Sequence, residues 1–158
     1  MTFTPDPNLD LVLERTVPVP PELVYKAWTT PELVKQWFAP RPFTTSECEI
    51  DLRPGGIFRT VMTTPEGEDM DGAGCVLEVV ENRRLAWTAA LGPGFRPQES
   101  DLPFTAVIDM EPDGNGGTLY RATAIHGTPE FATSHKEMGF FEGWGTVLDQ
   151  LVEVMQAS

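Results

Sequence analysis

Residues 135–155 constrain the fold most, because they combine a helical apolar pattern with three glycines. Positions 137, 141, 144, 148, 151 and 155 follow alternating steps of four and three residues, which place them on one face of an α-helix. Glu137 heads this face, and apolar side chains occupy the rest of it: Phe141, Trp144, Leu148, Leu151 and Met155. Gly139, Gly143 and Gly145 each disfavour a helix interior by about 1 kcal/mol relative to alanine, so packing must hold the helix together. A long closing helix that lies on a sheet is therefore predicted.

Chain length and cysteine usage place the protein in a broad class. At 158 residues the chain has the size of one domain and can bury a sizeable core without disulfides. We assign residues 9–156 to this domain and residues 1–8 to an extended N-terminal segment. The first residues form no basic leader, and no stretch approaches the roughly 20 apolar residues of a membrane span. Cys48 and Cys75 form no ligand motif and are expected to be buried, reduced thiols of a soluble, cytoplasmic protein.

The formal net charge of -13 excludes two classes of partner. The acidic residues are spread along the chain without a block of five like charges, which is typical of a solvated acidic surface. Binding to nucleic acid requires clustered lysine and arginine, and anionic membranes attract the same clusters. We therefore expect neither nucleic acid nor a membrane as a partner.

Periodicity in the first 38 residues predicts one strand and two short helices. Residues 9–17 alternate between leucine and polar positions, as in a strand with one buried face. A helix is predicted over 21–28, and Thr30 caps a second helix over 31–38 that has Pro31 at its first position.

The middle of the chain, from Phe43 to Ile125, carries β signals throughout. Alternating apolar residues separated by turn sequences predict three hairpins: 48–52 with 57–63, 76–80 with 85–89, and 104–110 with 118–126. Arg53–Gly56 has proline and glycine at the central positions of a type II turn. The Pro/Gly-rich segment Gly92–Pro103, which carries Phe95, is long enough to act as a lid. The prediction is seven strands in an antiparallel arrangement.

Even-numbered positions of the last two strands are expected to face the closing helix. This face of 104–110 and 118–126 includes the small residues Ala106, Ala122 and Ala124. Opposite them the helix presents Phe141 and Trp144. Small residues facing large ones either close into a filled core or leave a cavity, and both outcomes remain open at this point.

Four short motifs sharpen the assignment: Ala27–Leu33 with Trp37, Asp51–Arg59, Glu81–Trp87, and His135–Phe140 with Gly143–Gly145. With the order of elements, they resemble the helix-grip fold of the START and birch-pollen-allergen superfamily. Within it they look like the bacterial branch of the activator of heat-shock-protein-ninety ATPase-like family, over about residues 9 to 155. The resemblance implies an α+β fold, in which a curved antiparallel sheet of seven strands carries two short helices after its first strand and a long C-terminal helix across it. Three functions are implied by the same resemblance, namely binding of hydrophobic ligands, chaperone regulation, and catalysis on polycyclic compounds. Fold similarity alone does not choose among them.

Two groups of residues are candidates for a site. Aromatic and inward-facing residues serve either as plain core or as a ligand box, and as a box they comprise Trp37, Phe38, Phe58, Trp87, Phe95, Phe104, Tyr120, Ala122, Ala124, His126, Glu137, Phe141, Trp144 and Leu148. His126, His135 and Glu137 have the composition of an acid/base or metal group at the corner between the last strand and the closing helix. A structural pairing, ligand orientation and catalysis are the three interpretations of that second group.

The first hypothesis for function is binding of a small hydrophobic or aromatic molecule between sheet and closing helix, without a metal or other cofactor. The second is a protein-interaction module with a chaperone partner. The third is a lyase or cyclase that uses Glu137 with His126 or His135. A cavity connected to solvent favours the first and third over the second. Oligomeric state, including a homodimer, is left open by the sequence.

Overall fold

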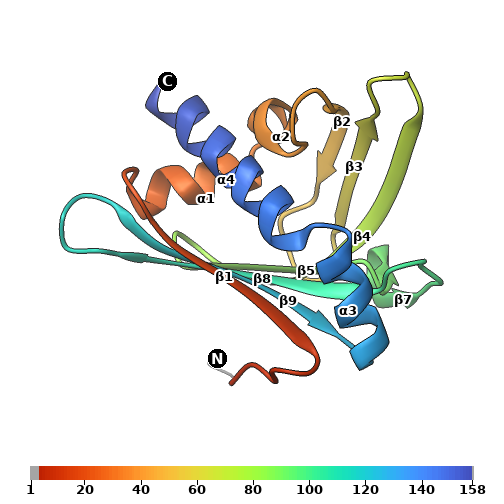
Figure 1. Cartoon of the computed structure of the whole chain (residues 1–158). Helices are drawn as coiled ribbons and strands as arrows, with labels where there is room; N and C mark the ends of the chain where they lie inside the picture. Colours follow the sequence, from red (N-terminus) through yellow and green to blue (C-terminus); the bar gives the residue numbers. More distant parts are fainter. Residues whose placement is uncertain (1–3, 158) are drawn as a thin grey trace.

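The structure is a computed structural model and describes residues 4–157. One curved antiparallel sheet is its main element (Figure 1). Its strands are ordered β1-β9-β8-β5-β4-β3-β2. Their bounds are Asp10–Val17 (β1), Thr44–Ile50 (β2), Ile57–Thr63 (β3), Asp69–Val80 (β4), Arg84–Thr88 (β5), Phe104–Pro112 (β8) and Thr118–His126 (β9). A two-stranded ribbon, β6 (Leu91–Gly92) with β7 (Arg96–Pro97), flanks the short 3-10 helix η1 (Pro93–Phe95) after β5.

Residues 4–157 form four α-helices, three of which lie over the concave side of the sheet (Figure 1). They are α1 (Pro21–Thr29), α2 (Pro31–Trp37), α3 (Pro129–Glu137) and α4 (Phe140–Gln156). Figure 1 shows α4 running across the sheet, with α1 and α2 beside its C-terminal half and α3 at the end of β9. The α+β fold class and the helix-grip arrangement expected from the resemblance are confirmed.

The three predicted hairpins form, and the bounds predicted for β3 and β9 match those observed. The type II turn also forms: the Gly56 amide donates to the Arg53 carbonyl at 2.8 Å, and Gly55 has φ +86°, which favours glycine. Strand β4 begins at Asp69, seven residues before the predicted start at position 76, and pairs with β3. Aspartate and glycine at positions 69–74 have low β propensity, so the sequence pattern does not reveal this part of the strand.

The predicted closing helix is interrupted, and this is a correction. Gly139 adopts a left-handed conformation with φ +93°, which ends α3 and starts α4 in a new direction. The apolar spacing continues in register across this glycine, and for that reason it predicts one continuous helix. Glu137 therefore lies exposed at the end of α3 rather than on the sheet-facing stripe of α4, so its predicted inward position is wrong.

The N-terminal segment differs from expectation in part. Residues 1–3 of the predicted extended segment lie outside the described residues. Residues 7–9 form a turn, in which the amides of Leu9 and Asp10 both donate to the Asp6 carbonyl. Within residues 4–157, no helix has the length and apolar character needed to cross a membrane.

The C-terminal half of α4 is fixed by a buried polar contact with the end of α2. Gln150 is 5% exposed. Its side-chain amide nitrogen donates to the carbonyls of Trp37 and Ala39 at 3.0 and 2.8 Å. Its amide oxygen accepts from the backbone N–H of Arg41 at 3.1 Å. One side chain thus satisfies one carbonyl group at the end of α2 and two backbone groups in the segment that follows it.

Replacement of Gln150 by leucine should lower the free energy of unfolding by about 2–4 kcal/mol, because each buried polar group left unpaired costs about 1–3 kcal/mol. Urea unfolding of Gln150→Leu checks this. Its neighbour Asp149 is exposed and makes only a 4.0 Å ion pair with Arg15, so Asp149→Ala should change stability by less than about 0.5 kcal/mol. Equal effects of the two substitutions would contradict the role of Gln150.

Candidate functional site

A cavity of about 1130 Å³ lies between the sheet and the N-terminal half of α4. Strands β3, β4, β5, β8 and β9, helices α1, α2 and α3, and the segment 98–103 complete its wall. Exposed residues at its edge, such as Glu99 and Met138, show that it opens to solvent. Its lining residues are Trp28, Trp37, Phe38, Pro40, Phe58, Thr60, Met62, Asp71–Gly74, Trp87, Ala89, Gln98–Asp101, Pro103, Phe104, Tyr120, His135, Met138–Phe140, Gly143, Trp144 and Val147.

Two glycines in the wall leave space that side chains would otherwise fill. On β4, Gly72 pairs with Thr60, and a Cβ atom added to it would meet nothing within 4 Å. The same holds for Gly143 on α4. The helix glycine that disfavours α4 by propensity thus lies where the helix borders the cavity.

Aromatic rings follow one another along the wall from the sheet to α4. Phe58 and Trp87 stack with ring centroids 4.6 Å apart and planes inclined by 6°. Trp87 meets Phe104 at 5.5 Å, and Phe104 meets Trp144 at 6.1 Å. Phe140 lies against Trp144 at 4.8 Å. The result is an apolar wall that suits flat, ring-containing molecules.

Half of the residues predicted for a ligand box line this cavity: Trp37, Phe38, Phe58, Trp87, Phe104, Tyr120 and Trp144. The helical spacing predicts Trp144 at the centre of the buried stripe, and the structure places it half-buried at the cavity wall.

The other predicted residues lie elsewhere. Ala122, Ala124 and Leu148 belong to the filled core, so the inward alanines do not create the cavity. The Phe95 ring packs over Gly55 and is half exposed. Phe141 is half-buried off the wall, and Glu137 is exposed.

Several wall residues were missed by sequence reasoning. Trp28 follows the buried Val24 by one helical turn, and that spacing could have identified it. Phe140, Gly143 and Val147 follow steps of three and four from the start of α4. Recognition of Gly139 as a helix end would have identified them.

The fold brings His126 and His135 together at the wall of the cavity. His126 Nε2 lies 2.9 Å from His135 Nδ1, and His126 Nδ1 lies 2.7 Å from the Leu9 carbonyl oxygen. The two histidines are 3% and 6% exposed. His135 lines the cavity, whereas His126 lies behind it. Burial, and to a smaller extent the nearby His126, lower the pKa of His135 to about 4. Its ring is therefore neutral at neutral pH.

Three further polar groups of the wall are buried, on Trp28, Tyr120 and Trp87. Trp28 Nε1 donates to Tyr120 Oη at 3.1 Å, and burial raises the pKa of Tyr120 above its ordinary value. The indole N–H of Trp87 has no hydrogen-bond partner among residues 4–157. A buried donor of this kind normally pairs with a protein group, a water or a bound molecule.

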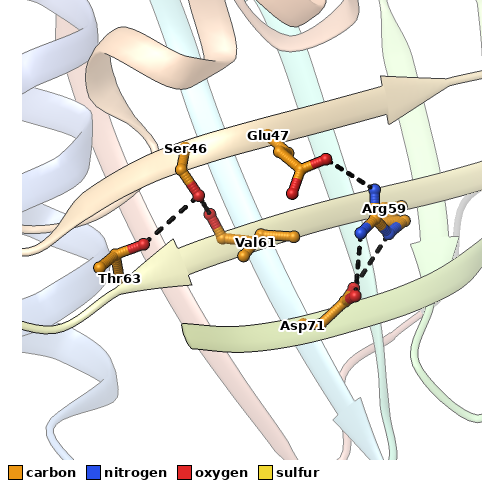
Figure 2. A network of polar contacts seen from close by, with 6 residues as sticks. All are labelled: Ser46, Glu47, Arg59, Val61, Thr63 and Asp71. Atoms are coloured by element: carbon orange, nitrogen blue, oxygen red, sulfur yellow. Dashed lines mark hydrogen bonds and ion pairs between the residues drawn. The ribbon is translucent and has the colours of Figure 1, made fainter. Parts of the chain in front are cut away.

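Carboxylates mark the mouth of the cavity. Asp71, Glu99 and Asp101 belong to the lining, which contains no lysine or arginine among the described residues. On β4, Asp71 accepts two bonds from Arg59, at 3.0 and 2.9 Å, which hold the pKa of Asp71 below its ordinary value. Figure 2 shows Arg59 between Glu47 and Asp71. Glu47 Oε1 lies 3.5 Å from a terminal guanidinium nitrogen of Arg59. No group of three potential metal ligands occurs in the described part of the chain.

A smaller hollow of about 430 Å³ includes outward-facing residues of β1, β5, β8 and β9. Two ion pairs lie within it, Arg84 with Asp109 at 2.7 Å and Arg121 with Glu14 at 3.6 Å. This hollow is a polar surface feature, and the aromatic cavity remains the candidate site.

Known structures define the class of protein. The fold is similar to an X-ray structure of a protein from Nitrosomonas europaea, with a TM-score of 0.92 and 47% identity over 96% of this chain and 97% of that one. A crystal structure of a protein from Mycobacterium smegmatis gives a TM-score of 0.79 at 23% identity over 96% and 93% of the two chains. An X-ray structure of a protein from Chromobacterium violaceum gives 0.74 at 25% identity over 92% and 96%. The chain is therefore a helix-grip protein, and its cavity is aromatic.

The family follows from the sequence of the chain. Residues 18–156 match the model of the activator of Hsp90 ATPase homolog 1-like protein family. The chain belongs to this family, as its motifs indicated. No match was found among curated proteins.

Buried His135 should make stability depend on pH. The pKa of His135 is about 4 in the folded protein and about 6.5 in an unfolded chain, so between these values only the unfolded state binds the proton. Stability is therefore complete above about pH 6.5 and falls as pH decreases toward 4. Urea unfolding at pH 7.5 and pH 5 should show a loss about 2 kcal/mol larger in wild type than in His135→Phe. Equal losses of stability in wild type and His135→Phe would show that His135 binds a proton equally well in the folded and the unfolded state.

Proposed function

We propose that this chain binds a small hydrophobic or aromatic molecule in the cavity between the sheet and α4, without a cofactor. The supporting observation is the solvent-connected cavity of about 1130 Å³ with its row of aromatic rings. Small-molecule sites typically have volumes of about 300–1,000 Å³, mostly apolar walls and a few polar groups. The aromatic wall provides the apolar surface, Trp87, Tyr120 and His135 provide buried polar groups within it, and the carboxylates lie at the mouth. We propose the cytoplasm as the place of action, in keeping with two free cysteines.

The two alternative functions have less support. The family description suggests a chaperone-binding module. A filled interior and a contiguous exposed apolar patch would favour that function. A cavity lies beside the filled core, and the exposed large apolar residues are spread over β4, β9, η1 and two connecting segments. A lyase or cyclase mechanism depends on Glu137, which is exposed and does not line the cavity.

The binding proposal is tested by filling the cavity from α4. Gly143→Phe places a ring where a Cβ atom meets nothing within 4 Å. The neutral probe N-phenyl-1-naphthylamine should gain fluorescence on binding to wild type. The phenylalanine variant should bind it at least about tenfold more weakly, a loss of about 1.4 kcal/mol.

Gly143→Ala is the matched control. It adds one methyl group, should preserve probe binding, and should stabilise α4 by up to about 1 kcal/mol. A probe that binds the phenylalanine variant as well as wild type would be bound outside this cavity. Absence of any fluorescence gain with wild type would overturn the proposed function.

A further inference from the structure

The histidine pair forms a short chain of hydrogen bonds that ends at the cavity. It starts at the Leu9 carbonyl, passes through both nitrogens of His126 and reaches His135 Nδ1. A carbonyl oxygen only accepts, so His126 Nδ1 carries a hydrogen. The direction of the second bond then depends on whether the pair is charged.

Both histidine rings are buried, and a charge on the pair would lack compensation from the protein. Within residues 4–157, neither ring makes an ion pair with a carboxylate that could compensate a charge. Around His135 lie the rings of Phe104, Phe140 and Trp144, at 4.8, 5.1 and 6.3 Å. A charge in such surroundings is costly, and the lowered pKa of His135 has the same cause.

In the neutral pair the hydrogen positions are determined. His126 Nε2 has a lone pair and accepts, so His135 Nδ1 donates to it. The remaining nitrogen, His135 Nε2, then carries a lone pair and no hydrogen. It makes no hydrogen bond within the described part of the chain, and it is not among the fully enclosed polar atoms without a partner.

We propose that His135 Nε2 is the polar anchor of the cavity and accepts a hydrogen bond from the hydroxyl of a neutral aromatic ligand. This inference rests on the proposed binding function and adds the chemical class of the ligand. His126 is a positioning residue, since its bond holds the His135 ring with Nδ1 turned away and Nε2 free. The aromatic rings beside His135 provide the surface on which a ring-bearing ligand lies.

Charge selects a hydroxyl over an acid. A carboxylate ligand has no hydrogen for Nε2, would meet the carboxylates of Glu99 and Asp101 at the mouth, and finds no lysine or arginine among the described lining residues. An ammonium ligand would bring an unpaired charge into apolar surroundings that disfavour a charged His135. A phenolic hydroxyl donates strongly while uncharged at neutral pH.

Two probes of nearly the same shape test the anchor. 2-Naphthol carries the hydroxyl hydrogen, and 2-methoxynaphthalene lacks it. At pH 7.5, displacement of N-phenyl-1-naphthylamine from wild type should show about tenfold tighter binding of 2-naphthol, as expected for one buried hydrogen bond. His135→Phe keeps a ring but removes the acceptor, and should reduce the preference to less than about twofold. Ser134→Ala, at an exposed position of α3, should keep the wild-type preference.

The outcomes separate this inference from the proposed function. Equal binding of the two probes to wild type overturns the anchor while leaving the cavity a binding site. Displacement by neither probe, together with no binding of the fluorescent probe, overturns both.

A measurement on wild type tests the same proposal without the His135→Phe variant, in case that variant does not fold. Long-range ¹H–¹⁵N NMR at pH 7.5 should find both histidines protonated at Nδ1 and bare at Nε2. A hydrogen on His135 Nε2 at that pH overturns the proposal.

Discussion

The packing of α4 on the concave side of the sheet is the constraint on which the rest of the structure depends. Its C-terminal half is tightly held, because Leu148, Leu151 and Met155 are buried in the core and Gln150 bonds the end of α2. Its N-terminal half borders open space through Gly143. One helix therefore closes the core at one end and roofs the cavity at the other. The buried C-terminal half of α4 stabilises the fold, whereas the N-terminal half, which borders the cavity, contributes less packing.

The architecture could be predicted because its signals are local and redundant. Alternation and turn sequences identified three hairpins, and Pro54-Gly55 placed a turn that the structure contains. The break at Gly139 was not predicted, since the apolar spacing of 141–155 continues in register with position 137. The predicted strand β4 is too short, because glycines such as Gly72 and Gly74 are typical of loops. In the structure both residues pair with β3. In β4 the pairing between strands thus outweighs the low β propensity of these residues.

The candidate site was harder to predict than the fold, because a cavity is defined by what is absent. The sequence left open whether Ala122 and Ala124 border a cavity or a filled core, and they lie in the filled core. Space arises instead at Gly72 and Gly143, on elements far apart in sequence. The contact between His126 and His135 depends on the corner from β9 into α3, whose start is capped by the Thr128 side chain at 3.2 Å from the Phe131 amide. The spacing of residues along the chain does not specify how such a corner places two side-chain rings.

The carboxylates at the mouth of the cavity also affect the rates at which molecules arrive. The chain carries a net charge of -13, so Glu99 and Asp101 lie in a field that repels anions from a distance and draws cations inward. At physiological ionic strength this field decays over about 8 Å, close to the length of a two-ring molecule. Discrimination by charge is thus confined to the last step of approach. Rising salt concentration accelerates entry of anions and slows that of cations, while entry of uncharged molecules is independent of salt.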